Sequence, residues 1–164
     1  MCVSGQGVRK GSESTIVARD GERCSGSDVS SFAIKAGCHT PPHIDTSCIW
    51  GSDCTDAIAC AIVSPVERNW TGSSKRAVVV SRRDRGAVID LLELDLGKNP
   101  VEQCKRPGIK ALSDLIAVLE KGGVGYVVVD FPRLCSYVIP SGCMHMFFTI
   151  GWTETTTWFP FLKV

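Results

Sequence analysis

The feature that most constrains the fold is a succession of short apolar runs in the second half of the chain, bounded by glycine- and proline-containing segments. These runs are rich in β-branched and aromatic residues, which is typical of β-strands. They lie at 77–81, 87–96, 125–131, 135–139, 143–150 and 153–159. One segment, at about 108–121, instead has apolar residues at helical spacing, and Gly122-Gly123 ends it. Successive hairpins give antiparallel pairing, so the sequence predicts an α+β fold: a mainly antiparallel sheet, or a small barrel, with one main helix.

The first two runs predict a hairpin, because the polar segment between them ends in Gly86. The same patterns predict the hydrophobic core. Its expected members are Val78, Val80, Leu92, Leu94, Leu112, Leu115, Ile116, Leu119, Val127, Val129, Val138 and Phe148.

The N-terminal half is predicted to be loop-rich and to contain most of its cysteines in a cluster. The segments 14–19 and 31–36 are candidates for short strands. Periodicity leaves 56–63 open between a helix of two turns and a buried strand. The length of 164 residues favours a single domain over 1–164. The weaker alternative is a cysteine-rich segment over 1–64 followed by an α+β domain over 65–164.

Composition excludes several classes of protein. Hydrophobic residues make up 44% and charged residues 21%, which is ordinary for a globular chain. No apolar run reaches the roughly 18–20 residues that span a bilayer, so no membrane span is expected. The net charge of +1 selects no partner, although residues 61–110 carry ten Lys/Arg against six Asp/Glu.

Nine cysteines are the most unusual feature of the composition, and an odd number cannot pair fully within one chain. Cysteines and histidines gather between residues 38 and 60. Disulfides, bound zinc and reduced core thiols each suit such a cluster. No Cys-x2-Cys pair is present to mark a zinc knuckle. We favour disulfides, because Gly, Ser and Pro leave little apolar surface to hold these loops. If zinc binds, its ligands come from Cys38, His39, His43, Cys48, Cys54 and Cys60.

A basic segment lies at 75–86, and guanidinium groups on the tip of a hairpin suit an anionic partner. The alternative is a solvated turn whose charges protect a sheet edge. Because no aromatic residue interleaves with the arginines, a protein is the expected partner rather than RNA. The residues are Lys75, Arg76, Arg82, Arg83 and Arg85.

A second candidate surface is the aromatic C-terminus with Trp152 and Trp158. Aromatic side chains dominate the binding energy of many interfaces, although terminal docking onto the core explains them as well. We therefore expect a small cysteine-rich binding protein that contacts a macromolecule through 75–86 or this aromatic edge. The sequon Asn69-Trp70-Thr71 favours secretion. A virulence or host-interaction factor is a further expectation for such a binding protein. A second alternative is a zinc-stabilised module that binds nucleic acid or protein.

The first alternative is an enzyme. His43, Asp90 and Cys143 follow one another in the order that chymotrypsin-like proteases use. In that hypothesis Cys143 attacks, His43 takes its proton and Asp90 orients the imidazole. Met144 after the nucleophile departs from the usual glycine, and a helix between acid and nucleophile is also atypical. His145 is expected to be a partly buried strand histidine. No resemblance to a known family carries site residues over to this chain.

Overall fold

The computed structural model describes residues 9–10, 30–47, 55–56, 59–65, 72–132 and 134–158. All strand pairings within this part of the chain are antiparallel, and helices accompany them, so the α+β class is confirmed. The elements are β1 (Arg9–Lys10), β2 (Ser30–Ile34), β3 (Thr46–Ser47), β4 (Thr55–Asp56), β5 (Ala59–Pro65), β6 (Lys75–Val80), the 3-10 turn η1 (Arg82–Asp84), α1 (Arg85–Leu92), α2 (Leu112–Lys121), β7 (Val127–Phe131), β8 (Cys135–Ile139), β9 (Met144–Thr149) and β10 (Thr153–Trp158).

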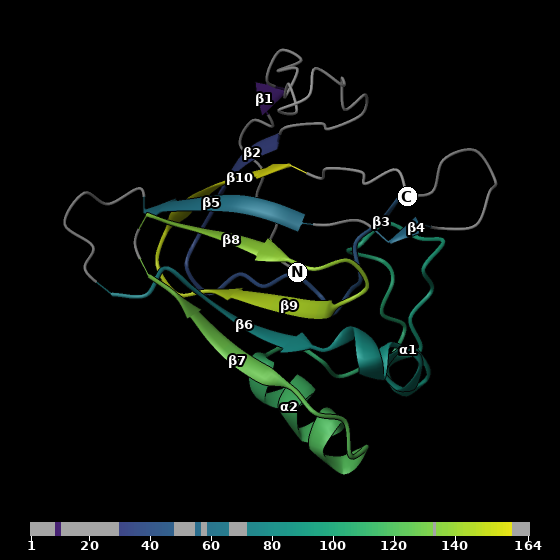
Figure 1. The fold of residues 1–164 in the computed structure, drawn as a ribbon. Helices are drawn as coiled ribbons and strands as arrows, with labels where there is room; N and C mark the ends of the chain where they lie inside the picture. The colour runs from purple at the N-terminus through teal and green to yellow at the C-terminus, as the bar shows by residue number, and fades with distance from the viewer. Residues whose placement is uncertain are drawn as a thin grey trace.

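The strands form two larger sheets rather than one. One has five strands in the order β1-β2-β10-β5-β8, and the other has three in the order β7-β6-β9; β3 and β4 pair separately. Figure 1 shows the two larger sheets facing each other, with α2 on the outer side of the three-stranded sheet. The three-stranded sheet therefore has one face towards the helices and one towards the other sheet.

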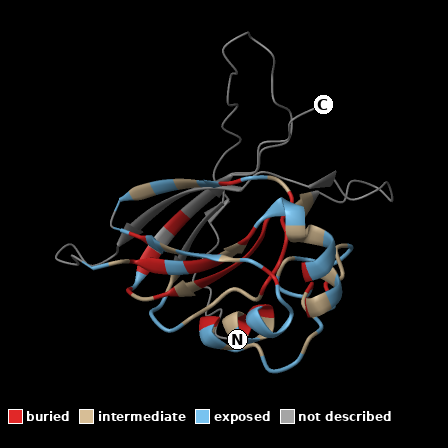
Figure 2. Ribbon diagram, turned by 60° about the horizontal axis from the view of Figure 1, so that its bottom comes forward, coloured by how far each residue is buried: buried red, intermediate tan, exposed pale blue. Residues whose placement is uncertain are grey.

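Side-chain alternation along β6 and β9 divides the interior into two cores. Val78 and Val80 of β6 lie opposite Met146 and Met144 of β9, and all four pack with α1 and α2. The intervening residues point to the opposite face and pack against the five-stranded sheet. This second core contains Ala77, Phe131, Ile139, Cys143 and Phe147. Figure 2 shows buried residues on the strands and on the inward sides of the helices.

The predicted helix is confirmed, but it begins at Leu112 rather than near residue 108. Gly108 has a φ of +88°, a left-handed conformation that a right-handed helix cannot contain. The Asp114 carboxylate accepts hydrogen bonds from the amides of Lys110 and Ala111, both at 2.9 Å, and so caps the first turn. None of the helices in the described ranges is long and apolar enough to cross a bilayer.

The strand predicted over 87–96 is wrong, and with it the basic hairpin and the single main helix. Residues 85–92 form α1 instead. Val88 and Leu92 lie one helical turn apart and are both buried against the core, so helical spacing satisfies them better than alternation does. Glu93 takes the left-handed conformation (φ 54°) and ends the helix. The strand β6 pairs with β7 and β9.

The structure confirms most of the other predicted strands. The segments at 125–131, 135–139, 143–150 and 153–159 contain β7 to β10, and 31–36 overlaps β2. Most of the ambiguous segment 56–63 belongs to the strand β5, whereas 14–19 lies outside the described residues. The choice between one domain and two stays a prediction.

Seven of the twelve predicted core residues are buried, and Ile116, Val129 and Phe148 are half-buried. The placements of Val127 and Val138 are wrong, because these side chains are 63% and 64% exposed. Both lie on strands at the edge of a sheet, β7 and β8.

Candidate metal centre

The segment that precedes β3 runs beside β9 and extends the edge of the three-stranded sheet. The amide of Thr40 donates to the carbonyl of Phe147 at 2.9 Å. Further along, His43 and His145 exchange both backbone hydrogen bonds, at 3.0 and 2.9 Å. Such a reciprocal pair places the two residues directly opposite each other. Two histidines 102 positions apart in the chain thus become neighbours.

Asp45 joins this pair because it lies two residues after His43, and side chains two apart on extended backbone share a face. Its Oδ1 lies 3.7 Å from Nε2 of His43, and its Oδ2 lies 3.4 Å from Nε2 of His145. One ligand atom from each of the three residues lies within 4.8 Å of the other two. All three side chains are buried.

The hydrogen bonds on the far side of each imidazole define which nitrogen carries the proton. Nδ1 of His43 lies 2.7 Å from the carbonyl oxygen of Pro41, and Nδ1 of His145 lies 3.2 Å from that of Cys143. A carbonyl oxygen only accepts, so each Nδ1 is the donor. In a neutral imidazole with its proton on Nδ1, the other nitrogen, Nε2, bears a lone pair. The Nε2 lone pairs of both histidines face the carboxylate of Asp45.

Electrostatics disfavour a second proton on the imidazole of His145, which would let its Nε2 donate to the carboxylate. Burial, together with the nearby His43, holds the pKa of His145 well below its usual value, although the bond to Cys143 acts the other way. Burial also raises the pKa of Asp45, and His43 partly opposes that rise. One proton on the carboxyl group would satisfy only one of the two contacts. Two imidazole nitrogens and a carboxylate oxygen, buried and converging, can hold a divalent metal ion.

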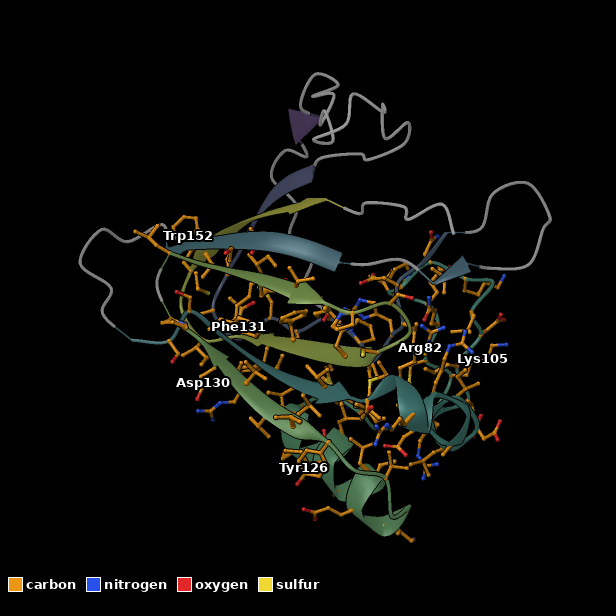
Figure 3. All side chains as sticks on the ribbon, in the orientation of Figure 1. Arg82, Lys105, Tyr126, Asp130, Phe131 and Trp152 are labelled. Carbon is orange, nitrogen blue, oxygen red and sulfur yellow. The ribbon has the colours of Figure 1, made fainter. Side chains whose placement is uncertain are left out.

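The surroundings of the three residues are aromatic. The Phe147 ring lies 5.4 Å from that of His145, and Tyr137 and Phe131 pack in turn against Phe147. Burial raises the pKa of Tyr137, and the negative charge of Asp45 adds to the rise. Figure 3 shows Phe131 among the side chains between the sheets. This aromatic layer keeps water away from one side of the cluster.

A buried lysine lies on the same face of the sheet. Lys75 is 3% exposed, and its Nζ lies 5.6 Å from the centre of the Phe147 ring. Burial lowers the pKa of Lys75 to about 8, whereas the nearby Cys135 acts to raise it. The ammonium group thus keeps most of its charge at neutral pH while it lies between the sheets.

The five-stranded sheet contains two buried threonine hydroxyl groups, on Thr153 and Thr155. Thr155 lies opposite Val63, and Val63 lies opposite Cys135, so the three share one face of the sheet. The Oγ1 atoms of Thr153 and Thr155 are buried and have no hydrogen-bond partner among the described residues.

The cysteine–histidine cluster predicted for zinc divides. His43 belongs to the centre, whereas His39 pairs with Phe148, and the carbonyl of Cys38 accepts from Thr149. The cluster found within the described residues contains neither of these two. Cys48 and Cys54 lie outside those residues, as does the side chain of Cys60.

Disulfides within 38–60 stay a prediction, because Cys48, Cys54 and the side chain of Cys60 lie outside the described residues. Elsewhere in the described residues, Cys104, Cys135 and Cys143 have free thiols.

The residues proposed for a protease do not come together as a triad. Asp90 is exposed on α1, which packs on the helix side of the sheet. Cys143 lies in the core between the sheets, next to His145 in the structure through its carbonyl group.

The basic residues disperse as well. Lys75 is buried, and Arg76 forms a two-point ion pair with Asp130 at 2.7 and 3.0 Å. Arg82 and Arg83 are exposed in η1, and Arg85 is half-buried in α1. In Figure 3 Arg82 lies near α1 and Trp152, which is 44% exposed, lies at the other end of the view.

Trp158 belongs to β10, opposite Cys60, and its side chain lies outside the described residues. A binding role for these surfaces, a protein partner and secretion stay predictions.

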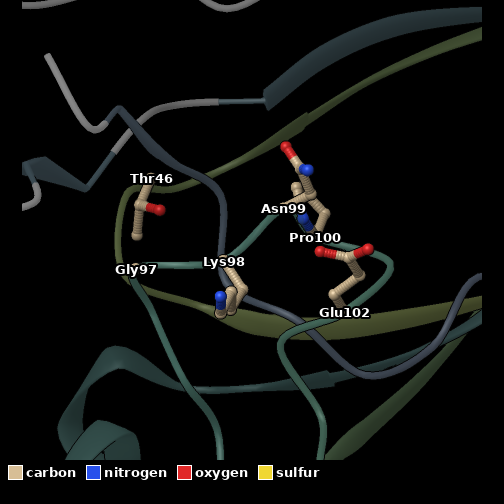
Figure 4. A pocket seen from close by; sticks show the side chains of 6 residues that line it. All are labelled: Thr46, Gly97, Lys98, Asn99, Pro100 and Glu102. Carbon is tan, nitrogen blue, oxygen red and sulfur yellow. The ribbon is translucent and has the colours of Figure 1, made fainter.

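A surface hollow of about 410 Å³ adjoins the segment that carries the centre. Figure 4 shows Thr46, Gly97, Lys98, Asn99, Pro100 and Glu102 around it. Thr46 follows Asp45 directly, and its hydroxyl donates to the carbonyl of Leu96 at 3.2 Å. The chain at Leu96, just before the loop over 97–102, therefore contacts the segment that carries the cluster.

No family model and no curated protein matches the chain. Two solved structures share 14% sequence identity with it at a TM-score of 0.43: recombinant oxalate oxidase in complex with glycolate, and oxalate oxidase in complex with the substrate analogue glycolate. Each match covers 85% of this chain and 44% of the other. The chain thus corresponds to less than half the length of those structures, and a likeness this distant carries no argument about activity.

Sequence reasoning identified His43 as a candidate ligand and missed Asp45 and the role of His145. A signal was present: a His-x-Asp spacing at 43–45, and a histidine within the apolar run 143–150. What the sequence lacked was the pairing that brings the two segments together.

Proposed function

We propose that the chain is a mononuclear metal-dependent enzyme of the non-haem iron(II) oxygenase class. The observation that carries the proposal is the convergence of His43, Asp45 and His145, with both Nε2 lone pairs facing the carboxylate. Two histidines and one carboxylate are the ligand set typical of such iron sites, because they leave coordination positions open for oxygen and a substrate. Zinc binds a similar set in hydrolytic sites, so metal identity is part of the test.

The bonds from each Nδ1 support the proposal. Metal-bound histidines almost always donate their other N–H to a carbonyl or carboxylate, which orients the ring and makes it a better ligand. The carbonyls of Pro41 and Cys143 supply this contact here. Both rings are therefore oriented by backbone atoms of the strands that carry them.

Lys75 supports a carboxylic acid as co-substrate. Full reduction of O₂ takes four electrons. The C–H bond that is hydroxylated supplies two of them, so a co-substrate must supply the other two. A 2-oxo acid does so: O₂, the 2-oxo acid and R–H give R–OH, CO₂ and the acid shortened by one carbon. Bound iron would supply oxygen activation in this reaction. We propose that the Lys75 ammonium binds a distal carboxylate of that acid.

Aromatic residues lie between the cluster and Lys75. Phe147 touches both His145 and the Lys75 ammonium, so an acid that bridges metal and lysine would lie along its ring. Tyr137 and Phe131 cover the ring and exclude water, which strengthens the attraction between the ammonium and a carboxylate.

The experiment is anaerobic reconstitution of the full chain with Fe(II), Co(II) or Zn(II), followed by measurement of bound metal and of O₂ uptake. We expect one Fe(II) per chain, and O₂ uptake that 2-oxoglutarate supports better than pyruvate, which lacks the distal carboxylate. Asp45→Asn and His145→Ala should each abolish metal uptake. Lys75→Met should keep the metal and lose the preference for 2-oxoglutarate.

Each outcome decides part of the proposal. Retained metal binding in both ligand variants would refute the centre. Tight zinc binding without O₂ uptake by the iron form would refute the oxygenase and keep the metal centre. Uptake that Lys75→Met leaves unchanged would refute the co-substrate site alone.

A further inference from the structure

A second buried polar side chain contacts the metal-binding segment from the other side. Gln103 is fully buried and lies in the irregular loop between α1 and α2. Its own backbone is tied to the segment after α1, because the amide of Asp95 donates to its carbonyl at 2.8 Å. A buried amide group costs free energy unless it is hydrogen-bonded, so its partners indicate what it does.

Those partners are the two backbone groups of one residue. Oε1 of Gln103 accepts from the amide of Ile44 at 2.9 Å, and Nε2 donates to the carbonyl of Ile44 at 2.9 Å. The second proton on Nε2 points to the carbonyl of Lys98 at 3.4 Å. The side chain thus imitates a residue of a neighbouring strand, which would exchange the same two bonds with Ile44.

Ile44 is the residue between His43 and Asp45. In an extended segment, successive residues present their backbone groups to opposite edges. His43 uses one edge to pair with His145, and Ile44 uses the other edge to pair with Gln103. The segment is held on both edges, although β9 is the only one of the two partners that is a strand.

We propose that Gln103 is a positioning residue for the metal centre. By holding both backbone groups of Ile44, it keeps residues 43–45 extended, and this conformation directs the His43 and Asp45 side chains to one face. It acts through the backbone and touches no ligand atom. The inference rests on the proposed metal centre, and it adds that the loop between the helices sets the geometry of that centre.

The test compares three variants of the full chain by titration with Co(II), whose visible absorption reports on coordination geometry. Gln103→Met keeps the length of the side chain and loses both bonds. Gln103→Asn keeps the amide but is one methylene too short to reach. Glu102→Gln changes the exposed neighbour and is the matched control.

We expect Gln103→Met and Gln103→Asn to weaken Co(II) binding about 10- to 100-fold, the range seen when outer-shell partners of metal ligands are removed. Their Co(II) spectra should differ in shape from that of the wild type. Glu102→Gln should match the wild type in both respects. The titrations are made well below the melting temperature of each variant, so that a loss of stability does not imitate a loss of affinity.

Hydrogen exchange of the Ile44 amide is the second measurement, because it needs no metal. Loss of the bond to Oε1 should speed this exchange by about tenfold or more in Gln103→Met, the equivalent of one hydrogen bond. Unchanged exchange would show that Gln103 does not hold the segment and would overturn the inference.

An affinity within twofold of the wild type, with an unchanged spectrum, would also overturn it while leaving the proposed centre standing. A wild-type chain that takes up no Co(II) would refute the proposed centre, and the positioning role with it.

Discussion

The two faces of the three-stranded sheet are built from the same strands but differ in the kind of side chain that they bury. The face towards the helices is apolar: Val78, Val80, Met144 and Met146 meet the leucines of α1 and α2. On the face towards the other sheet, Lys75 and His145 lie on the sheet's own strands, and the adjoining segment adds His43 and Asp45. Tyr137 of the other sheet packs against Phe147 of this face. Both faces are buried, so exclusion of water alone does not separate them.

The difference shows how one strand serves stability and chemistry at once. In β9 the residues Met144, His145, Met146 and Phe147 alternate between the faces. The methionines strengthen the apolar core, which offsets the free energy of burying the charged groups on the reverse side. We therefore expect truncations on the helix side to lower stability without changing ligand binding. Substitutions between the sheets should change ligand binding, and removal of the buried charge there should raise stability.

Leu115→Ala should have the largest effect on stability. Leu115 is fully buried in the core on the helix side, and truncation of such a leucine costs about 2–5 kcal/mol through lost burial and the cavity left behind. Metal affinity of the folded protein should stay at the wild-type value. Urea unfolding and Co(II) titration measure the two quantities. A loss below about 1 kcal/mol, or a change in affinity, would remove the distinction between the faces.

Lys75→Met should act in the opposite direction and stabilise the protein at pH 7 by about 2 kcal/mol. Burial lowers the pKa of Lys75 from 10.5 to about 8, so the folded state disfavours the charged form. Between pH 8 and 10.5 the unfolded chain binds more protons than the folded one, and wild-type stability should rise with pH by about 3 kcal/mol. Below pH 8 the destabilisation is constant.

The variant should lack this rise, which urea unfolding at a series of pH values would show. If wild-type stability is flat from pH 8 to 10.5, the lysine is not held charged in a dry interior. Its proposed role towards a carboxylate would then lose its electrostatic basis.

How far the sequence predicts this molecule depends on whether the signal is local. The strands β7 to β10 and the helix α2 were predictable, because alternation, helical spacing and the glycines that end them are properties of adjacent residues. The helix α1 was not predictable, because the positions of Val88 and Leu92 suit two structures. They would share one face of a strand, with Asp90 as its polar member, and they also share one face of a helix. Packing against α2 decides between the two.

The candidate metal centre requires a contact that no local pattern contains. The sequence grouped His43 with Cys38 and His39, which the cluster does not contain. It also grouped His43 with three cysteines whose side chains lie outside the described residues, Cys48, Cys54 and Cys60. The partner of His43, His145, is 102 residues away, and backbone pairing rather than any motif brings the two together. The role of Gln103 depends on a distant contact as well. No pattern in the sequence marks it, but in the structure its side chain makes the two hydrogen bonds to Ile44 that a neighbouring strand would make.

Val138→Thr should have the smallest effect, and it tests the outer face of the five-stranded sheet. Val138 is 64% exposed, while its neighbours Tyr137 and Ile139 point inwards. The exchange keeps the β-branched shape, so stability should change by no more than about 0.5 kcal/mol. The same exchange at the fully buried Val80 should cost about 1–3 kcal/mol, because it buries a hydroxyl group. Urea unfolding of the two Val→Thr variants compares an exposed position with a buried one for the same substitution. A cost above about 1 kcal/mol at Val138 would mean that this face is covered in solution, and sedimentation at two concentrations would then show whether a second copy of the chain covers it.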